Sequence, residues 1–317
     1  MTMNNNFLNN LLNSISVSGY EEQVQDIVEE EMKDYVDEVR RDEMQNVTCV
    51  INPNSDIRIM LSAHADEIGL MISNIREDGR LQVIDRGGIV PSTYPGHAIS
   101  IKTSKGIVYG VVEAYRELFK EKDLGTKQFR IDIGAKDRED ALSYVSIGDP
   151  IVLDTTIRKL ANDKFTARAL DDRLGVYIIM EAIKRAKKQG CTVGVYAAST
   201  TGEETTKTGA YWTSTRINPS MAIVVDVTYT SDCSGMDPAE MGTVLLGGGP
   251  VLCNSPIVVK ALNTKMEECA KTAGIQIQRE AASRLSYTDG DKIHFSNQGV
   301  PTVLVSIPLR YMHMPAE

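Results

Sequence analysis

The sequence predicts an α/β domain that is interrupted by a small β-barrel. Short apolar runs ending in polar residues alternate with amphipathic helical patterns in the first and last parts of the chain, which is the rhythm of an α/β fold. The middle instead holds short alternating runs separated by Gly, Pro, Asp and Lys, a texture typical of small barrels. A chain of 317 residues is long enough for two domains. We therefore expect an α/β domain over residues 1–68 plus 161–317 and an inserted barrel over 69–160.

The amino-terminal part predicts two helices followed by a buried strand. Helical patterns cover residues 5–16 and 21–35, and Ser18 with Glu21 three positions later forms a capping-box pattern for the second helix. The run IRIMLSA over 57–63 is too short for a helix and ends in the polar sequence HADE. The carboxyl end of such a strand is where α/β sheets hold their ligands.

The remaining elements follow the same reasoning. The expected barrel strands lie in the runs LQVIDR, HAISIKT, GIVYGVVEA, FRIDIGA and DPIVLDT. The charged stretches REDALSYV and YRELFKEKDLGTK of the insert predict loops or solvated faces. After the insert we expect helices at 172–190 and 255–274, and strands at 191–199, 221–227 and 300–308.

Composition limits the possible functions. The chain carries 34 Lys and Arg against 43 Asp and Glu, a net charge of -9, which argues against nucleic acid and anionic membranes as partners. The start of the chain lacks the basic and apolar regions of a signal peptide, and no run of eighteen apolar residues occurs, so we expect a cytoplasmic protein. Five cysteines without CxxC spacing predict reduced thiols.

Five potential metal ligands each follow an apolar, strand-like run. Hydrolysis by two metal ions needs nitrogen and oxygen ligands, a carboxylate that bridges the ions and a carboxylate base. Glu203 beside one ligand is a candidate general base, and Asp66 could hold the second nitrogen of a ligating imidazole. Taken singly, such residues are more often helix caps, solvated pairs or turn residues. The complete set favours a dinuclear site, with the ligands His64, Asp171, Glu204, Asp226 and His313.

Several motifs resemble one known family. HADEIG, ALDDRLG, the two glutamates followed by TGA, VVDVT, TDGDKIH and IPLRYMH are similar to the tetrahedral aminopeptidases, metallopeptidases that include glutamyl and deblocking aminopeptidases. The resemblance covers about residues 8–317. It implies a phosphopeptidase-like three-layer α/β/α domain with an inserted barrel that mediates dimerisation. It also implies peptide substrates, dimers assembled into dodecamers, and two divalent metal ions per subunit, zinc or cobalt and possibly manganese.

The resemblance also implies a role for each residue. His64 and Asp226 would serve one metal, Glu204 and His313 the other, and Asp171 would bridge them across a cis bond to the next aspartate. Glu203 would act as general base and acid, and water activated at the metals would attack the first peptide bond. Residues near these motifs that could contact substrate are Arg310, Tyr311, Gly248 and His294.

The chain departs from the family pattern at three points. TTKTGA replaces the usual VGLRGA-like segment after the two glutamates, which puts substrate preference in question. Asp291 stands where a small residue is more usual, and the sequence stops at Glu317, earlier than in most relatives. A catalytically impaired, truncated homologue is therefore one alternative.

Other functions also stay open. A dinuclear amidohydrolase or deacylase could use the same ligands, although such enzymes usually need a basic residue to hold a substrate carboxylate. A binding protein with structural metals would have no use for the free base at Glu203. An endoglucanase is disfavoured because a single Trp offers little surface for stacking sugars.

Overall fold

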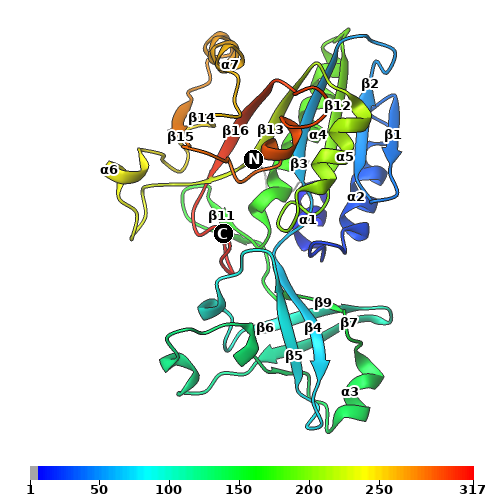
Figure 1. Cartoon of the computed structure of the whole chain (residues 1–317), viewed down its shortest axis with the longest axis vertical. Coiled ribbons are helices and arrows are strands. Elements are labelled where there is room, and N and C mark those ends of the chain that lie inside the picture. The colour runs from blue at the N-terminus through cyan, green and yellow to red at the C-terminus, as the bar shows by residue number, and fades with distance from the viewer. Residues whose placement is uncertain (1–5) are drawn as a thin grey trace.

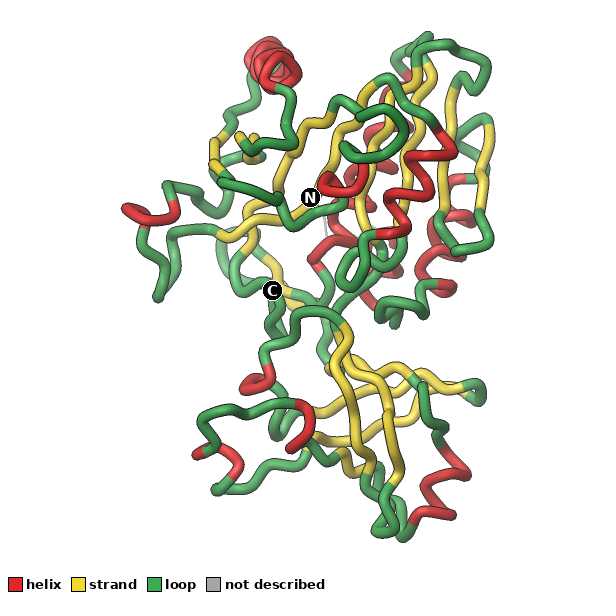
Figure 2. Tube along the Cα trace, viewed as in Figure 1, coloured by secondary structure: helices red, strands yellow, loops and turns green. Residues whose placement is uncertain are grey.

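The computed structural model describes residues 6–317 and has two parts, a helix-covered sheet and a separate barrel (Figure 1). The sheet has eight strands in the order β1-β2-β12-β3-β13-β16-β14-β15. Figure 2 shows the strands of the barrel gathered below this sheet. The predicted combination of an α/β domain and a barrel is confirmed.

The sheet draws its strands from both ends of the chain. The central strands β12, β3, β13 and β16 run parallel, whereas β2 and β14 pair antiparallel with their inner neighbours. The sheet strands are β1 (Glu38–Arg41), β2 (Val47–Ile51), β3 (Arg58–His64), β12 (Gly194–Thr200), β13 (Met221–Tyr229), β14 (Val251–Asn254), β15 (Gln278–Ala281) and β16 (Thr302–Leu309).

Helices cover both faces of the sheet. Apolar side chains of α1 (Asn6–Asn13), α2 (Glu22–Met32) and α4 (Leu170–Lys188) form one core with the sheet. Side chains of α5 (Thr208–Ile217) and α8 (Gly290–Ile293) form a second core on the opposite face. The arrangement is the three-layer architecture that the motifs imply. The remaining helices of this part are α6 (Pro238–Met241) and α7 (Lys260–Thr272).

The barrel is closed and has its own core. Its strands are arranged β4-β5-β8-β7-β6-β9, and alternate side chains such as Leu70, Ile99 and Ile151 are fully buried inside. The strands are β4 (Gly69–Ile75), β5 (Leu81–Arg86), β6 (Ala98–Thr103), β7 (Gly106–Val112), β8 (Ile131–Asp132) and β9 (Pro150–Leu153). Short 3-10 turns lie at Pro91–Thr93, Leu118–Lys120 and Thr126–Gln128, and a small ribbon, β10 (Arg158–Lys159) with β11 (Phe165–Thr166), follows.

One local sequence prediction is confirmed in part and one is wrong. The stretch REDALSYV, expected to be a loop or a solvated face, forms a helix, α3 (Arg138–Tyr144), whose side chains are mostly exposed; the Asp137 side chain caps it and Ala141 is buried. The Ser18–Glu21 pattern is not a capping box. The Ser18 hydroxyl donates to Asp66, and Glu21 accepts from the backbone of Gly202, so both side chains have partners far along the chain.

The other boundaries lie close to those expected. The first helix is Asn6–Asn13, and its expected start at residue 5 lies outside the described residues. The strand expected at 57–63 is Arg58–His64, so His64 is the last residue of β3. Within residues 6–317, no helix is both long and apolar enough to cross a membrane.

Candidate active site

The carboxyl edge of the parallel strands brings the five predicted metal ligands together. His64 ends β3, Asp226 lies in β13, and Asp171 follows the first residue of α4. The side chains form two groups of ligand atoms within 4.8 Å of one another, His64 with Asp171 and Asp226, and Asp171 with Glu204 and His313. Asp171 belongs to both groups, so its two oxygens face different neighbours.

The distances support that division. His64 Nε2 lies 3.1 Å from Asp171 Oδ1 and 3.9 Å from Asp226 Oδ1. His313 Nε2 lies 3.3 Å from Asp171 Oδ2 and 3.3 Å from Glu204 Oε1. Each group therefore offers one imidazole nitrogen and carboxylate oxygens, a donor set that suits zinc, cobalt or manganese.

Backbone geometry at the start of α4 presents the shared aspartate. The peptide bond between Asp171 and Asp172 is cis, as the resemblance implies. Asp172 is fully buried and accepts hydrogen bonds from the backbone of His64 (3.3 Å) and of Gly175 (3.1 Å). A side chain at Gly175 would collide with the Asp172 carboxylate, which explains the glycine in the DDRLG motif.

Each imidazole ring is oriented by a backbone carbonyl oxygen that lies at its Nδ1 atom. The Nδ1 atom of His64 lies 3.1 Å from the carbonyl oxygen of Asp66, and Nδ1 of His313 lies 2.8 Å from the carbonyl oxygen of Gly88. A proton on each Nδ1 leaves Nε2 free to bind a metal. Gly88 belongs to the barrel insert, and a Cβ at this position would come within 3.1 Å of the His313 ring. The insert therefore contributes directly to the site.

Asp66 connects the strand end to the two glutamates. Its buried carboxylate accepts hydrogen bonds from the backbone N–H of Glu203 (3.0 Å) and of Glu204 (3.2 Å), and also from the Ser18 hydroxyl. It lies 3.4 Å from His64 Nδ1 as well. Asp66 thus links the glutamate loop to the end of β3 that carries His64.

The pKa shifts in the site are those of a buried cluster in which carboxylates outnumber cationic side chains. Burial raises the pKa of Glu204 to about 7, although its hydrogen bond with His313 opposes this. Burial also raises the pKa of Asp226 well above its usual range. Burial would lower the pKa of His313, but its bonds to Asp171 and Glu204 raise it to about 11. A divalent cation would satisfy the charge that these buried carboxylates carry.

Glu203 lies beside the ligand groups without belonging to either. Its carboxylate is buried, with Oε2 3.9 Å from His64 Nε2, and it forms an ion pair with Lys207. Burial raises its pKa, while His64 and Lys207 oppose the shift. The position next to both groups suits a proton acceptor.

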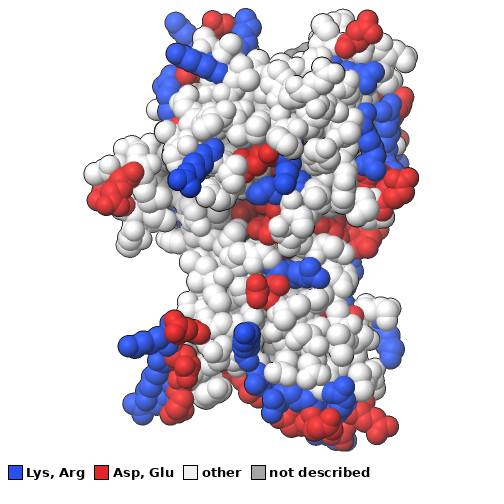
Figure 3. Space-filling model, viewed as in Figure 1, with Lys and Arg blue, Asp and Glu red and all other residues white. Residues whose placement is uncertain are grey.

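The site opens into a cavity of about 490 Å³. Figure 3 shows this face of the molecule hollowed near the junction of the two parts, with acidic side chains visible in the hollow. The cavity is lined by His64, Gly88, Asp171, Glu203, Glu204, Thr205, Lys207, Asp226, Val227, Thr228, Tyr229, Ser286, Tyr287, Thr288, Met312 and His313.

Comparison with known proteins identifies the family. The family model described as M42 glutamyl aminopeptidase matches residues 45–317. The chain belongs to this family. It is therefore an aminopeptidase, a hydrolase of peptide bonds.

Individual relatives agree with this assignment. The lysyl aminopeptidase of Pyrococcus furiosus is 32% identical over 317 residues, covering 97% of this chain and 89% of the relative. The TET aminopeptidase of a marine sediment Thaumarchaeota archaeon superposes with a TM-score of 0.91 at 31% identity, covering 98% and 89%. The TET1 peptidase of Pyrococcus horikoshii, which can assemble into a tetrahedron or a large octahedral shell, gives 0.86 at 30% identity, covering 98% and 92%.

The four predicted substrate-contact residues do not line the catalytic cavity of this aminopeptidase. Arg310 pairs with Asp232, and Tyr311 is exposed in a neighbouring, more apolar hollow. Gly248 packs against the Gln278 side chain, where a Cβ would come within 2.7 Å. His294 follows α8, and its ring stacks edge-on with that of Phe295. Contact of these four residues with substrate stays a prediction.

Sequence reasoning also missed two residues. Glu317 is buried and accepts hydrogen bonds from the backbone N–H of Asp171 and of His313, both at 3.1 Å, so one carboxylate holds two candidate ligands that are far apart in the sequence. Lys207 pairs with Glu203 from within the unusual TTKTGA segment. That departure from the family pattern was the only sequence signal for Lys207, and none marked Glu317.

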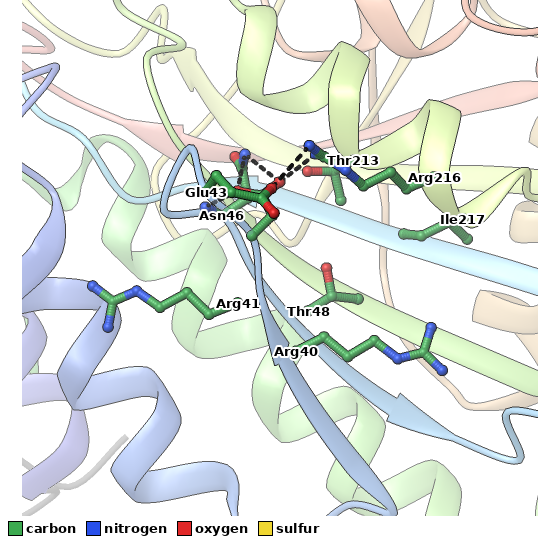
Figure 4. A pocket seen from close by; sticks show the side chains of 9 residues that line it. Arg40, Arg41, Glu43, Asn46, Thr48, Thr213, Arg216 and Ile217 are labelled. Carbon is green, nitrogen blue, oxygen red and sulfur yellow. Dashed lines mark hydrogen bonds and ion pairs between the residues drawn. The ribbon is translucent and has the colours of Figure 1, made fainter.

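A second hollow of about 270 Å³ lies between β1, β2 and α5 (Figure 4). Its charged groups are engaged with one another or with nearby helices. Arg216 pairs with Asp42, which also accepts from Asn46, and Arg41 reaches Asp26 and Glu29 on α2. This hollow offers no unpaired group comparable to those of the catalytic cavity.

Proposed function

We propose that this aminopeptidase is metal-dependent and removes single residues from the amino terminus of short peptides. The observation that carries the proposal is the position of Asp171, which is shared by two groups of ligand atoms, next to the buried carboxylate of Glu203. His64 and Asp226 would hold one cation, Glu204 and His313 the other, with Asp171 between them.

The donor chemistry of the cluster fits such ions. Asp226 is 5% exposed, and among residues 6–317 its carboxylate accepts a hydrogen bond only from the backbone of Val227, at 2.8 Å. His64 Nε2 lies 3.9 Å from it. A buried carboxylate so poorly neutralised is costly unless a cation binds it. Two bound divalent cations would supply Lewis acidity that lowers the pKa of an attacking water and polarises the peptide carbonyl.

The side chains account for proton movement and orientation. Glu203 accepts the proton of the attacking water and returns it to the nitrogen of the departing peptide. Lys207 holds one oxygen of the Glu203 carboxylate, so the other remains directed toward His64 and the site. A free α-amino group would be attracted by the surrounding carboxylates, which favours cleavage at the first peptide bond.

A deacylase of similar architecture is the main competing function. The two differ in whether the substrate needs a free amino terminus. We expect Leu-Ala-Ala to be cleaved with release of leucine and its N-acetylated form to be resistant. Release of acetate from the blocked peptide, with no cleavage of the free one, would favour the deacylase.

We also propose that the barrel mediates dimerisation, and that dimers associate into larger assemblies such as a dodecamer. The outward side chains of β7, Ile107, Tyr109 and Val111, are 45%, 65% and 45% exposed and form an apolar strip. Tyr109→Glu should reduce the mass measured by light scattering, whereas the same change at Tyr211 on α5, away from the strip, should not. An unchanged mass in Tyr109→Glu would argue against assembly through β7.

The family model is named for glutamyl substrates, whereas one relative is named for lysyl substrates. These names therefore do not establish which amino-terminal residue of a peptide substrate this enzyme prefers.

A further inference from the structure

A side cavity of about 290 Å³ adjoins the catalytic cavity. The two cavities lie side by side, since they share five lining residues, which are Val227, Thr228, Ser286, Tyr287 and Thr288. The side cavity is of the size of a single side-chain subsite, just below the range of about 300–1,000 Å³ for whole small-molecule sites.

The side cavity lies over the sheet face that carries a proposed metal ligand. Asp226 and Thr228 are two residues apart on β13, so their side chains point to the same face and their Cα atoms are roughly 7 Å apart. Ser306 on β16 is paired with Asp226 across the parallel ladder and also lines the side cavity. A substrate whose amino group lies among the carboxylates of the catalytic site can therefore place its first side chain here.

The floor of the side cavity carries one negative charge. Glu280 on β15 reaches across the sheet, where Oε2 accepts a hydrogen bond from the Thr228 hydroxyl (2.5 Å) and Oε1 accepts one from the Ser306 hydroxyl (2.9 Å). No cationic side chain within residues 6–317 forms an ion pair with this half-buried carboxylate. Each oxygen keeps free acceptor capacity. The neighbouring Cys253 thiol stays neutral because burial and Glu280 raise its pKa to about 12.

We propose that this side cavity selects a basic amino-terminal residue, Lys or Arg, through Glu280. The apolar walls, which include Leu304 and Ala282, would contact the aliphatic part of the side chain, and Glu280 would bind the charged end. An apolar side chain would strip water from the Glu280 carboxylate without replacing its hydrogen bonds, and an acidic one would be repelled. This assignment rests on the proposed aminopeptidase reaction and names its substrate class.

Two cationic side chains near the two cavities, Lys207 and Arg284, do not oppose the proposed preference for a basic residue. Lys207 lines the catalytic cavity but is already paired with Glu203. Arg284 lines the side cavity but is exposed to solvent, where water and salt screen its charge. Within the part of the chain that the structure describes, Glu280 is therefore the acidic residue lining the side cavity, and it forms no ion pair.

The test compares lysyl-, norleucyl- and glutamyl-p-nitroanilides, since norleucine has the aliphatic chain of lysine without its ammonium group. Metal-loaded wild-type protein should cleave the lysyl substrate with a kcat/KM at least about tenfold above that of the norleucyl substrate, and the glutamyl substrate should be the poorest. The isosteric variant Glu280→Gln should lose most of this ratio, because its kcat/KM should fall far more on the lysyl substrate than on the norleucyl substrate. Arg284→Met serves as the matched control and should leave the lysyl-to-norleucyl ratio in place.

The outcomes separate this assignment from the proposed reaction. Cleavage with a preference for norleucyl or glutamyl substrates in the wild type would overturn the role of Glu280 and leave the aminopeptidase intact, and this result needs no variant. An unchanged lysyl-to-norleucyl ratio in Glu280→Gln would also overturn it. Failure to release p-nitroaniline from any of the three substrates would contradict the proposed reaction itself and, with it, this substrate class.

Discussion

Replacing Glu203 by Gln isolates the proposed proton transfer. Glu203 belongs to neither group of ligand atoms, and its Oε2 lies 3.9 Å from His64 Nε2, so the change should leave both groups able to bind metal. Glutamine keeps the size of the side chain and cannot accept the proton of the attacking water. General acid–base catalysis contributes about 10²- to 10⁴-fold, so kcat should fall by that amount with little change in KM.

The adjacent Glu204→Gln is the matched control. Glu204 Oε1 lies 3.3 Å from His313 Nε2 inside a ligand group, so this variant should lose metal and regain part of its activity in excess metal. Steady-state kinetics and elemental analysis of the two variants give the comparison. The reasoning would be refuted by a Glu203→Gln variant within about threefold of wild-type kcat, or by one that loses metal as Glu204→Gln does.

Three further predictions concern charge. Lys207→Met removes the ion pair that opposes the upward pKa shift of Glu203, so the acidic limb of the pH profile of kcat/KM should move to higher pH. If this limb does not move, Lys207 does not influence the pKa of the catalytic base. His313, whose pKa near 11 in the metal-free site leaves it protonated at neutral pH, must lose a proton when metal binds. Metal affinity should therefore rise between pH 6 and 9, and calorimetry in buffers of different ionisation enthalpy should detect proton release that falls in His313→Ala. Arg173→Met leaves the buried carboxylate of Glu67 with fewer cationic partners and should lower the free energy of unfolding in urea by about 3–5 kcal/mol, partly recovered by adding Glu67→Gln.

The fold, and the grouping of the five candidate ligand side chains, could be predicted from the sequence because both depend on strong local patterns. His64 and Asp226 end or follow apolar runs, and parallel strands bring such positions to one edge of the sheet. The shared position of Asp171 between two groups agrees with the bridging role implied by its motif. Each of these features can be recognised within a single segment, and the topology of a parallel sheet then brings the segments together.

The contacts that escaped prediction all join distant segments. Ser18 and Glu21 match a helix cap locally, yet their side chains bond to Asp66 and to the backbone of Gly202, since tertiary hydrogen bonds outcompete the local pattern. Glu280 lies in a strand with no motif, and its significance comes only from the cavity above it.

The central claim, hydrolysis dependent on two metal ions per subunit, is tested most directly by titrating metal into chelated protein. Release of p-nitroaniline from a lysyl substrate should be absent after chelation and should rise with added Zn²⁺ or Co²⁺ until two equivalents per subunit are bound. Full activity in the chelated, metal-free protein, or saturation with both equivalents bound and no cleavage of any free peptide, would contradict it.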